Sequence, residues 1–146
     1  MKAIQNATLV MKDHLIPDGV ILIEDGKIVS FGERKHIAIP RECQEVMDAE
    51  GKFVGPGLID IHTHSDGEVF FQEDPVRASR HHLRHGTTTV LPALYFSMGT
   101  EEYVRVIRIL RKAMEDPNCA NIAGLYMEGP YLNPKFGCDR ESNPWK

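Results

Sequence analysis

The stretch that decides the fold is Gly-Pro-Gly-Leu-Ile-Asp-Ile-His-Thr-His, residues 55–64. Its Gly-Pro-Gly opening breaks regular structure, and the apolar run 58–62 that follows has the length of a short buried strand. Because side chains two residues apart in an extended chain point to the same side, His62 and His64 can reach one ion at the end of that strand. Histidine is the commonest metal ligand, although exposed or capping histidines produce the same spacing. These two residues are the first candidate for a functional site.

Strand and helix signals alternate after the two histidines. Asp74-Pro75 is typical of a helix start, with an aspartate N-cap and proline at the first helical position, and Gly86 is typical of the residue just past a helix end. The β-branched run 87–91 then predicts a second strand, which we expect to end at Pro92.

A second helix and a third strand follow. The acidic residues within 100–102 favour a helix start, and the Asp-Pro pair at 116–117 is expected to end that helix. Its core-facing stripe is predicted to consist of Val104, Ile107, Leu110 and Met114. Residues 121–127 predict the third strand, which ends at Glu128. Strands that alternate with helices favour parallel pairing, and chemistry in such sheets gathers at the carboxyl ends of the strands.

Glu128 is therefore the second candidate, because the end of its strand would face the same edge as the two histidines. The alternative is a solvated loop acid. Two imidazoles and a carboxylate favour a divalent ion such as zinc or iron. Asp60 either supports a ligand from behind or faces a helix, and Asp66 is a loop acid with no partner evident in the sequence. We interpret a further cluster as a solvated helix face, and it comprises His81, His82 and His85.

The first 54 residues read as β structure. Asp25-Gly26 stands between two apolar runs and predicts a hairpin, because a type I′ turn needs positive φ at both central positions. Residues 17–19, Pro-Asp-Gly, predict another turn. Short strands are expected near 45–47 and 52–54. The segment is expected to be part of a small β-sheet domain.

The composition excludes several classes of function. The 17 basic and 21 acidic residues are mixed along the chain and give a net charge of −4, so no electrostatic footprint for nucleic acid is present. No apolar run approaches the ~18 residues that a membrane span needs. The three cysteines are far apart and odd in number, which favours reduced thiols in a cytoplasmic protein.

Three motifs resemble a known family. Residues 55–64 resemble the strand-1 signature of the amidohydrolase superfamily. Residues 124–135, Gly-Leu-Tyr-Met-Glu-Gly-Pro-Tyr-Leu-Asn-Pro-Lys, resemble the Gly-Leu-His-x-Glu-Gly-Pro-Phe-x-Asn segment of N-acetylglucosamine-6-phosphate deacetylases. Residues 86–92, Gly-Thr-Thr-Thr-Val-Leu-Pro, are also typical of the family.

The resemblance implies an α/β fold in two parts. Residues 1–54 would form a portion of a β-sandwich, and residues 55–146 would form the first three strands of a (β/α)₈ barrel, which is incomplete. Such a barrel takes about 250 residues. We therefore expect the chain to be the front portion of a longer polypeptide.

The resemblance also implies a metal-dependent amide hydrolase that removes the acetyl group from N-acetylglucosamine 6-phosphate or a related N-acyl amino sugar. His62, His64 and Glu128 would be metal ligands, with one or two divalent ions, zinc or iron. The proton-shuttling Asp and two further His ligands are expected beyond Lys146, so the chain alone is expected to be inactive. No catalytic or substrate-binding residue is assigned within it. The expected partner is a small amino sugar phosphate, and the full-length protein is expected to dimerise by analogy with the family.

Two alternatives stay open. After Lys135 the family continues with a Gly-Ala-His-like turn that touches the sugar, whereas this chain reads Phe-Gly-Cys-Asp-Arg at 136–140, so the acyl sugar is not fixed. A cyclic amidohydrolase of the dihydroorotase type shares the first motif but normally carries a carboxylated lysine, for which no candidate is obvious. The third reading is a non-catalytic piece without activity of its own.

Overall fold

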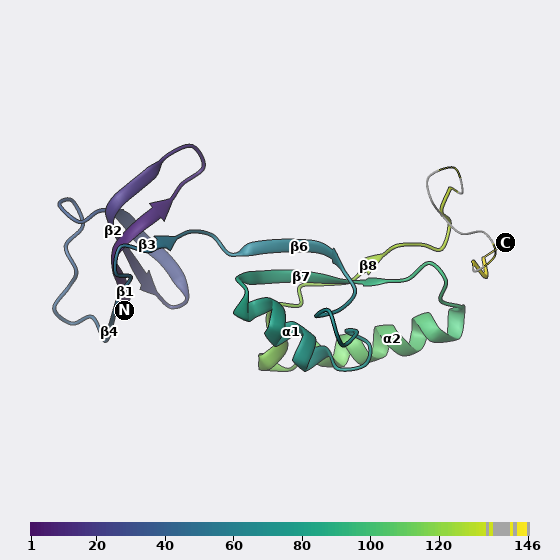
Figure 1. The fold of residues 1–146 in the computed structure, drawn as a ribbon. Helices are drawn as coiled ribbons and strands as arrows, with labels where there is room; N and C mark the ends of the chain where they lie inside the picture. The colour runs from purple at the N-terminus through teal and green to yellow at the C-terminus, as the bar shows by residue number, and fades with distance from the viewer. Residues whose placement is uncertain (134, 136–140, 142, 146) are drawn as a thin grey trace. The chain divides into compact units, whose positions relative to one another are not determined.

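The computed structural model describes residues 1–133, 135, 141 and 143–145 (Figure 1). The chain divides into two compact units, Met1–Pro56 and Gly57–Lys146. The division falls inside the Gly-Pro-Gly segment that the sequence marks as a breaker. Each unit has its own sheet, and both helices belong to the second unit, so the mixed α/β class predicted from the sequence is confirmed.

The first unit is one five-stranded sheet. Its strands are β1 (Lys2–Val10), β2 (Leu15–Glu24), β3 (Lys27–Glu33), β4 (Glu45–Asp48) and β5 (Phe53–Val54). β1, β2 and β3 pair antiparallel, whereas β4 and β5 pair parallel to β1. The core of this unit consists of two small apolar clusters, one around Val20 and one around Leu9.

Of the two turns predicted in this sheet, the structure contains one. Asp25 and Gly26 have φ of 50° and 73°, so the hairpin between β2 and β3 is confirmed. The turn predicted at 17–19 is wrong, because these residues lie inside β2. A Cβ on Gly19 would lie 2.4 Å from the Leu9 side chain. This glycine therefore makes room for a core leucine instead of turning the chain.

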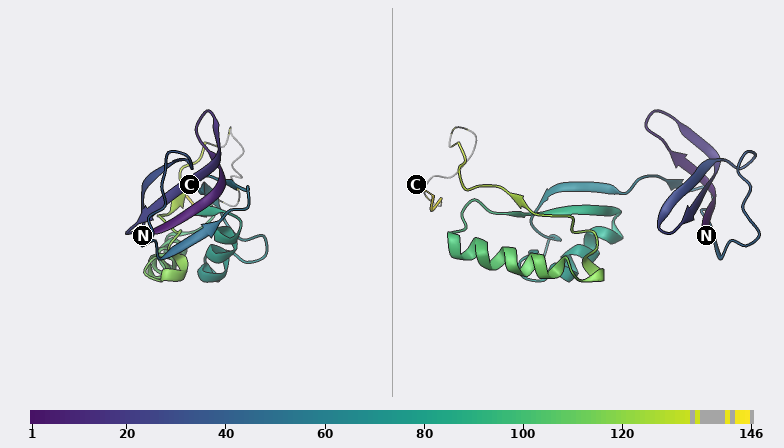
Figure 2. Two further views of the ribbon diagram at one scale, coloured as in Figure 1. Left: turned by 90° about the vertical axis from the view of Figure 1, so that its left-hand side faces the viewer. Right: turned by 180° about the vertical axis from the view of Figure 1, so that it is seen from behind.

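The second unit alternates strands with helices along a three-stranded sheet of order β6-β7-β8. The elements are β6 (Leu58–Thr63), α1 (Pro75–Arg84), β7 (Thr87–Leu94), α2 (Thr100–Ala113), a 3₁₀ turn (Pro117–Cys119) and β8 (Tyr126–Met127). Both strand pairs are parallel, as predicted. The views in Figures 1 and 2 show α1 and α2 on the same face of this sheet. Neither helix is long and apolar enough to cross a membrane in the part of the chain that the structure describes.

Helix α1 begins and ends where the sequence predicts. The Asp74 carboxylate accepts a hydrogen bond from the Arg77 backbone N–H at 3.0 Å, and Pro75 is the first helical residue. Gly86 follows the helix with a φ of 88°, a conformation that glycine adopts at little cost. Local chemistry therefore sets both ends of this helix.

The strand ends differ from the prediction. β7 continues through Pro92, where the sequence predicts its end. The pairing with β6 is irregular between Asp60 and Thr63, which lies opposite Pro92, so the missing N–H of proline interrupts little. The third strand is shorter than predicted, because the chain bridges Val90 at Ile122 and rejoins the ladder only at β8.

Helix α2 presents a different face to the core from the predicted one. Its buried side chains are Tyr103, Val106, Leu110 and Ala113. Val104 and Met114 of the predicted stripe are exposed by 42% and 38%, and only Leu110 is common to both sets. Tyr103 turns inward because its hydroxyl donates to the Tyr95 carbonyl oxygen at 2.9 Å. Helical spacing predicts how often core-facing residues recur, but contacts such as this one determine which face of the helix is buried.

Two of the three cysteines are described, and both Cys43 and Cys119 are free, as predicted. Burial raises the pKa of the Cys119 thiol. Cys138 lies outside the described residues.

The orientation of α2 gives a stability prediction. Leu110 is 1% exposed, so Leu110→Ala should lower the free energy of unfolding of the intact protein by about 2–5 kcal/mol, because it leaves a cavity. Val104→Ala should cost less than about 1 kcal/mol, since Val104 is partly solvated. Urea unfolding followed by circular dichroism measures both. Equal losses from the two substitutions would contradict this orientation.

Candidate metal centre

Three predicted side chains meet at the carboxyl edge of the parallel sheet. His62 is near the end of β6, His64 follows β6, and Glu128 follows β8. One ligand atom from each lies within 4.8 Å of the others, and His62 Nε2 is 3.9 Å from Glu128 Oε1. Parallel strands bring their carboxyl ends to one edge, which explains how residues 64 positions apart in sequence converge.

His64 is held on two sides by β7 and the residue that follows it. Its Nδ1 lies 3.0 Å from the carbonyl oxygen of Ala93. A carbonyl can only accept, so Nδ1 carries the hydrogen, and in the neutral imidazole Nε2 then has its lone pair free for another partner. The imidazole also stacks on the Tyr95 ring, with centroids 3.8 Å apart and planes 4° from parallel.

His62 is held through its backbone and its ring face. Its backbone N–H donates to Asp60 Oδ1 at 3.0 Å, so Asp60 supports the main chain of a candidate ligand. Its imidazole stacks on Tyr126 with centroids 4.8 Å apart and planes 30° from parallel. The two histidine rings lie edge to face, 5.3 Å apart.

Glu128 extends the β7–β8 ladder and carries an unpaired buried oxygen. Its backbone N–H donates to the Leu94 carbonyl oxygen at 3.1 Å. Among the described residues, Oε2 is buried and has no hydrogen-bond partner, a situation that costs about 1–3 kcal/mol when nothing compensates it. Two imidazoles and one carboxylate form a donor set of catalytic zinc sites. The orphaned oxygen and this donor set both fit a divalent cation.

The carboxylate also affects two neighbouring phenols. Burial raises the pKa of Tyr95 and of Tyr103, and the negative charge of Glu128 raises both further. Both phenols therefore keep their protons at neutral pH.

Gly129 lies close to the segment that connects β7 to α2. A Cβ at this position would lie 2.8 Å from the Phe96 Cβ and 2.9 Å from its Cα. Only glycine fits against this backbone without a shift of the chain. The position of Glu128 therefore depends on the absence of a side chain at the next residue.

The supporting residues Ala93, Tyr95 and Tyr126 were missed by the sequence analysis. The sequence predicts the end of β7 at Pro92, so Ala93 falls outside the predicted strand, while Tyr95 follows the observed one. The only available signal was that Tyr95 follows an apolar strand in a parallel arrangement, as His64 does. Tyr126 belongs to the motif of Glu128 but carries no ligand pattern of its own.

The helix histidines lie apart from this centre. His81 and His85 are exposed, in line with the predicted solvated face. His82 differs from these two, because it is partly buried, its Nε2 lies 3.0 Å from the Ser65 carbonyl oxygen, and its ring stacks on Phe71. The loop after β6 folds onto α1 and covers this one ring.

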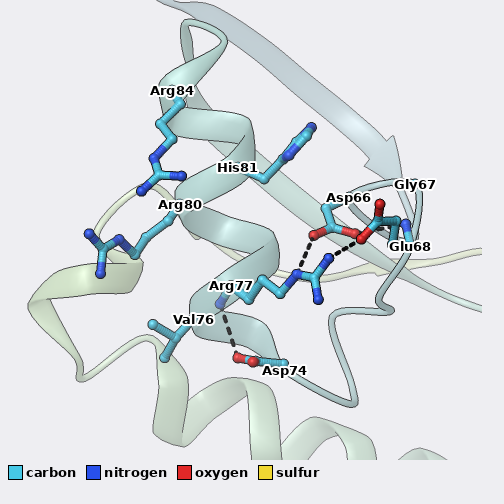
Figure 3. A pocket seen from close by; sticks show the side chains of 9 residues that line it. All are labelled: Asp66, Gly67, Glu68, Asp74, Val76, Arg77, Arg80, His81 and Arg84. Atoms are coloured by element: carbon cyan, nitrogen blue, oxygen red, sulfur yellow. Dashed lines mark hydrogen bonds and ion pairs between the residues drawn. The ribbon is translucent and has the colours of Figure 1, made fainter.

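Asp66 organises the same loop. Its side chain is 3% exposed and lies 3.1 Å from Arg77 Nε, and it accepts backbone N–H groups from Val69 and Glu68. These backbone bonds, and then the charge of Arg77, lower the pKa of its carboxyl group although burial opposes them. Figure 3 shows Asp66 beside a groove along α1. The groove includes none of the three candidate ligands, so Asp66 shapes the loop after His64 and lies outside the centre.

Known proteins with similar sequences or structures include amidohydrolases. No protein-family model matches the chain. A dihydroorotase from Lactobacillus gasseri is 30% identical over 133 residues, which cover 89% of this chain and 28% of that protein. The N-acetylglucosamine-6-phosphate deacetylase from Pasteurella multocida gives a TM-score of 0.75 with 26% identity, over 96% of this chain and 37% of that one.

A second crystal structure is similar. The N-acetyl-D-glucosamine-6-phosphate deacetylase from Mycobacterium smegmatis gives a TM-score of 0.72 with 26% identity, over 96% of this chain and 38% of that one. A variant of the latter enzyme has been solved in complex with N-acetyl-D-glucosamine 6-phosphate. This chain thus spans between 28% and 38% of the length of the three proteins.

The two deacetylases belong to the amidohydrolases that carry a TIM-barrel domain. The likeness to them covers nearly the whole chain, in line with the three sequence motifs. The chain resembles the N-acetylglucosamine-6-phosphate deacetylases of the amidohydrolase superfamily, as its sequence indicates.

Proposed function

We propose that this chain is part of a metal-dependent amide hydrolase that removes the acetyl group from N-acetylglucosamine 6-phosphate or a related N-acyl amino sugar. The observation that carries the proposal is the convergence of His62, His64 and Glu128 within 4.8 Å at the carboxyl edge of a parallel sheet. Its substrate class is supported by the likeness to two deacetylases of that sugar phosphate.

The three residues would hold a divalent ion, zinc or iron, alone or as one of two. Such an ion, when bound, polarises an amide carbonyl and lowers the pKa of a bound water. The chain itself aims the ligand atoms: the Ala93 carbonyl fixes the tautomer of His64, and the β7–β8 ladder fixes the backbone of Glu128. The proton-shuttling Asp is expected beyond Lys146, so these residues bind and orient and leave proton transfer to another part of the protein.

The architecture proposed with this function has a β-sandwich portion over 1–54 and the start of a (β/α)₈ barrel over 55–146. The intact protein is proposed to be cytoplasmic and homodimeric. The substrate-binding residues stay unassigned, because the segment 136–140, where the family turn that touches the sugar would fall, lies outside the described residues.

A cyclic amidohydrolase is the second candidate, favoured by the 30% identity to a dihydroorotase. It would open a ring amide instead of releasing acetate. Assay of dihydroorotate hydrolysis beside acetate release separates the two, because each substrate gives a different product.

The third candidate is that the chain by itself is a non-catalytic piece. Three exposed apolar side chains on β6 favour it: Leu58, Ile59 and Ile61, at 63%, 69% and 58%. Zinc titration of the 146-residue chain decides this reading. A tight stoichiometric site in the isolated chain would count against it.

The main proposal predicts chelator-sensitive deacetylation. The product of the complete gene should release acetate from N-acetylglucosamine 6-phosphate, and a chelator should abolish the release until zinc or iron is restored. Enzymatic quantitation of acetate measures it. Turnover that is indifferent to the chelator, or no turnover on any N-acyl amino sugar, would refute the deacetylase assignment.

Loss of the carboxylate should weaken the metal centre. Glu128→Gln keeps the shape of the side chain but removes its charge, so we expect zinc affinity and kcat/KM to fall by about a hundredfold or more, beyond the 10–100-fold typical of residues outside the ligand set. Glu115→Gln, an exposed glutamate after α2, is the matched control and should stay within about twofold. Competition titration with a chromogenic chelator gives the affinities.

The glycine after this ligand gives a positional test. Gly129→Ala should lower zinc affinity by about tenfold, because the new methyl group must push Glu128 away from the Phe96 backbone. Gly99→Ala is the matched control, since a Cβ there meets nothing within 4 Å. An unchanged affinity in Gly129→Ala would show that Glu128 does not need its present position.

A further inference from the structure

We propose that Tyr95 is a positioning residue of the metal centre, whose ring holds the face of His64 so that Nε2 is presented to the ion. The inference rests on the proposed function, because it assigns His64 as a ligand. It adds a residue that no ligand motif contains. Tyr95 directly follows β7, a strand that supplies no ligand of its own among the described residues.

The stacking of Tyr95 on His64 is closer and flatter than the other aromatic contact of the centre. The two centroids are 3.8 Å apart and the planes differ by 4°, whereas the His62–Tyr126 pair has 4.8 Å and 30°. Aromatic pairs in proteins commonly lie 4.5–7 Å apart. The His64 ring therefore has almost no freedom to tilt on the Tyr95 side.

Tyr95 is itself fixed by α2 and by the loop after β6. Its carbonyl oxygen accepts a hydrogen bond from the Tyr103 hydroxyl at 2.9 Å and another from the Met98 backbone N–H at 3.2 Å. Tyr103 is 5% exposed and belongs to the core. The Tyr95 ring also meets the edge of Phe70 at 6.1 Å. The two hydrogen bonds hold the backbone of Tyr95 and Phe70 contacts its ring, so the ring can restrain His64.

The two restraints on His64 act on different motions. The bond from Nδ1 to Ala93 fixes the tautomer and one direction in the ring plane. The stacked phenol opposes rotation of the plane, which a single hydrogen bond leaves free. Stacking uses the ring face, so the Tyr95 hydroxyl is not required and phenylalanine should serve equally well.

The test measures Co²⁺ binding to the intact protein made from the complete gene, after removal of endogenous metal. Cobalt reports both affinity and ligand geometry through its visible absorption. Tyr95→Leu should weaken Co²⁺ binding by about tenfold or more, the range for residues that orient metal ligands, and should alter the absorption band. Tyr95→Phe should bind within about twofold of the unaltered protein with the same band. Tyr131→Leu, at a tyrosine that is 85% exposed, is the matched control and should change neither.

The outcomes separate this inference from the proposed function. If the unaltered protein binds no Co²⁺, both are wrong. If it binds and Tyr95→Leu binds equally with the same band, the positioning role is wrong while the metal centre stands. A second measurement does not depend on the folding of any variant: in the unaltered protein with labelled histidine, the His64 ring protons should be shifted upfield by the stacked phenol. Ordinary shifts would overturn the inference.

Discussion

The parallel register of β6, β7 and β8 is the constraint on which the candidate centre depends. It places the two histidines, the Ala93 carbonyl and Glu128 at one edge, although they come from three separate strands. A shift of one residue in any strand would turn its side chains to the opposite face. The register of the sheet thus determines which side chains lie together, and the chemistry of those side chains determines what the candidate centre can bind.

Parallel strands cannot be joined by short turns, so the register depends on the two crossover helices. α1 is fixed by its own sequence, through the Asp74 cap and the Asp66–Arg77 ion pair. α2 is fixed by burial of one face against the sheet, centred on Leu110. Tyr103 connects this core to the site, because its hydroxyl reaches the carbonyl oxygen of Tyr95. The packing of α2 against the sheet therefore influences the edge that carries the candidate ligands.

The features that could be predicted from the sequence are those set by neighbouring residues, and the features that could not are those set by contacts between distant residues. The Asp25-Gly26 hairpin, the cap of α1 and the parallel strand order follow from short-range chemistry and from alternation of elements. The buried face of α2 and the role of Gly19 do not, since each depends on a partner distant in sequence. The three converging residues could be named because strand ends in a parallel sheet share an edge. The ring of Tyr95 could not, because nothing in its sequence neighbourhood distinguishes it from a core aromatic.

The spacing within the centre favours a shared ligand over a simple ion pair. A charge-assisted bond between an imidazolium and a carboxylate spans about 2.7–2.9 Å, whereas His62 Nε2 and Glu128 Oε1 are 3.9 Å apart. Two atoms bound tetrahedrally at about 2.1 Å to one zinc ion lie roughly 3.4 Å from each other. The observed distance is nearer to this second value, and the second carboxylate oxygen has no partner among the described residues. An ion pair with His62 would leave that oxygen uncompensated, while a cation between the three side chains would satisfy the carboxylate and use the free nitrogen of His64 as well.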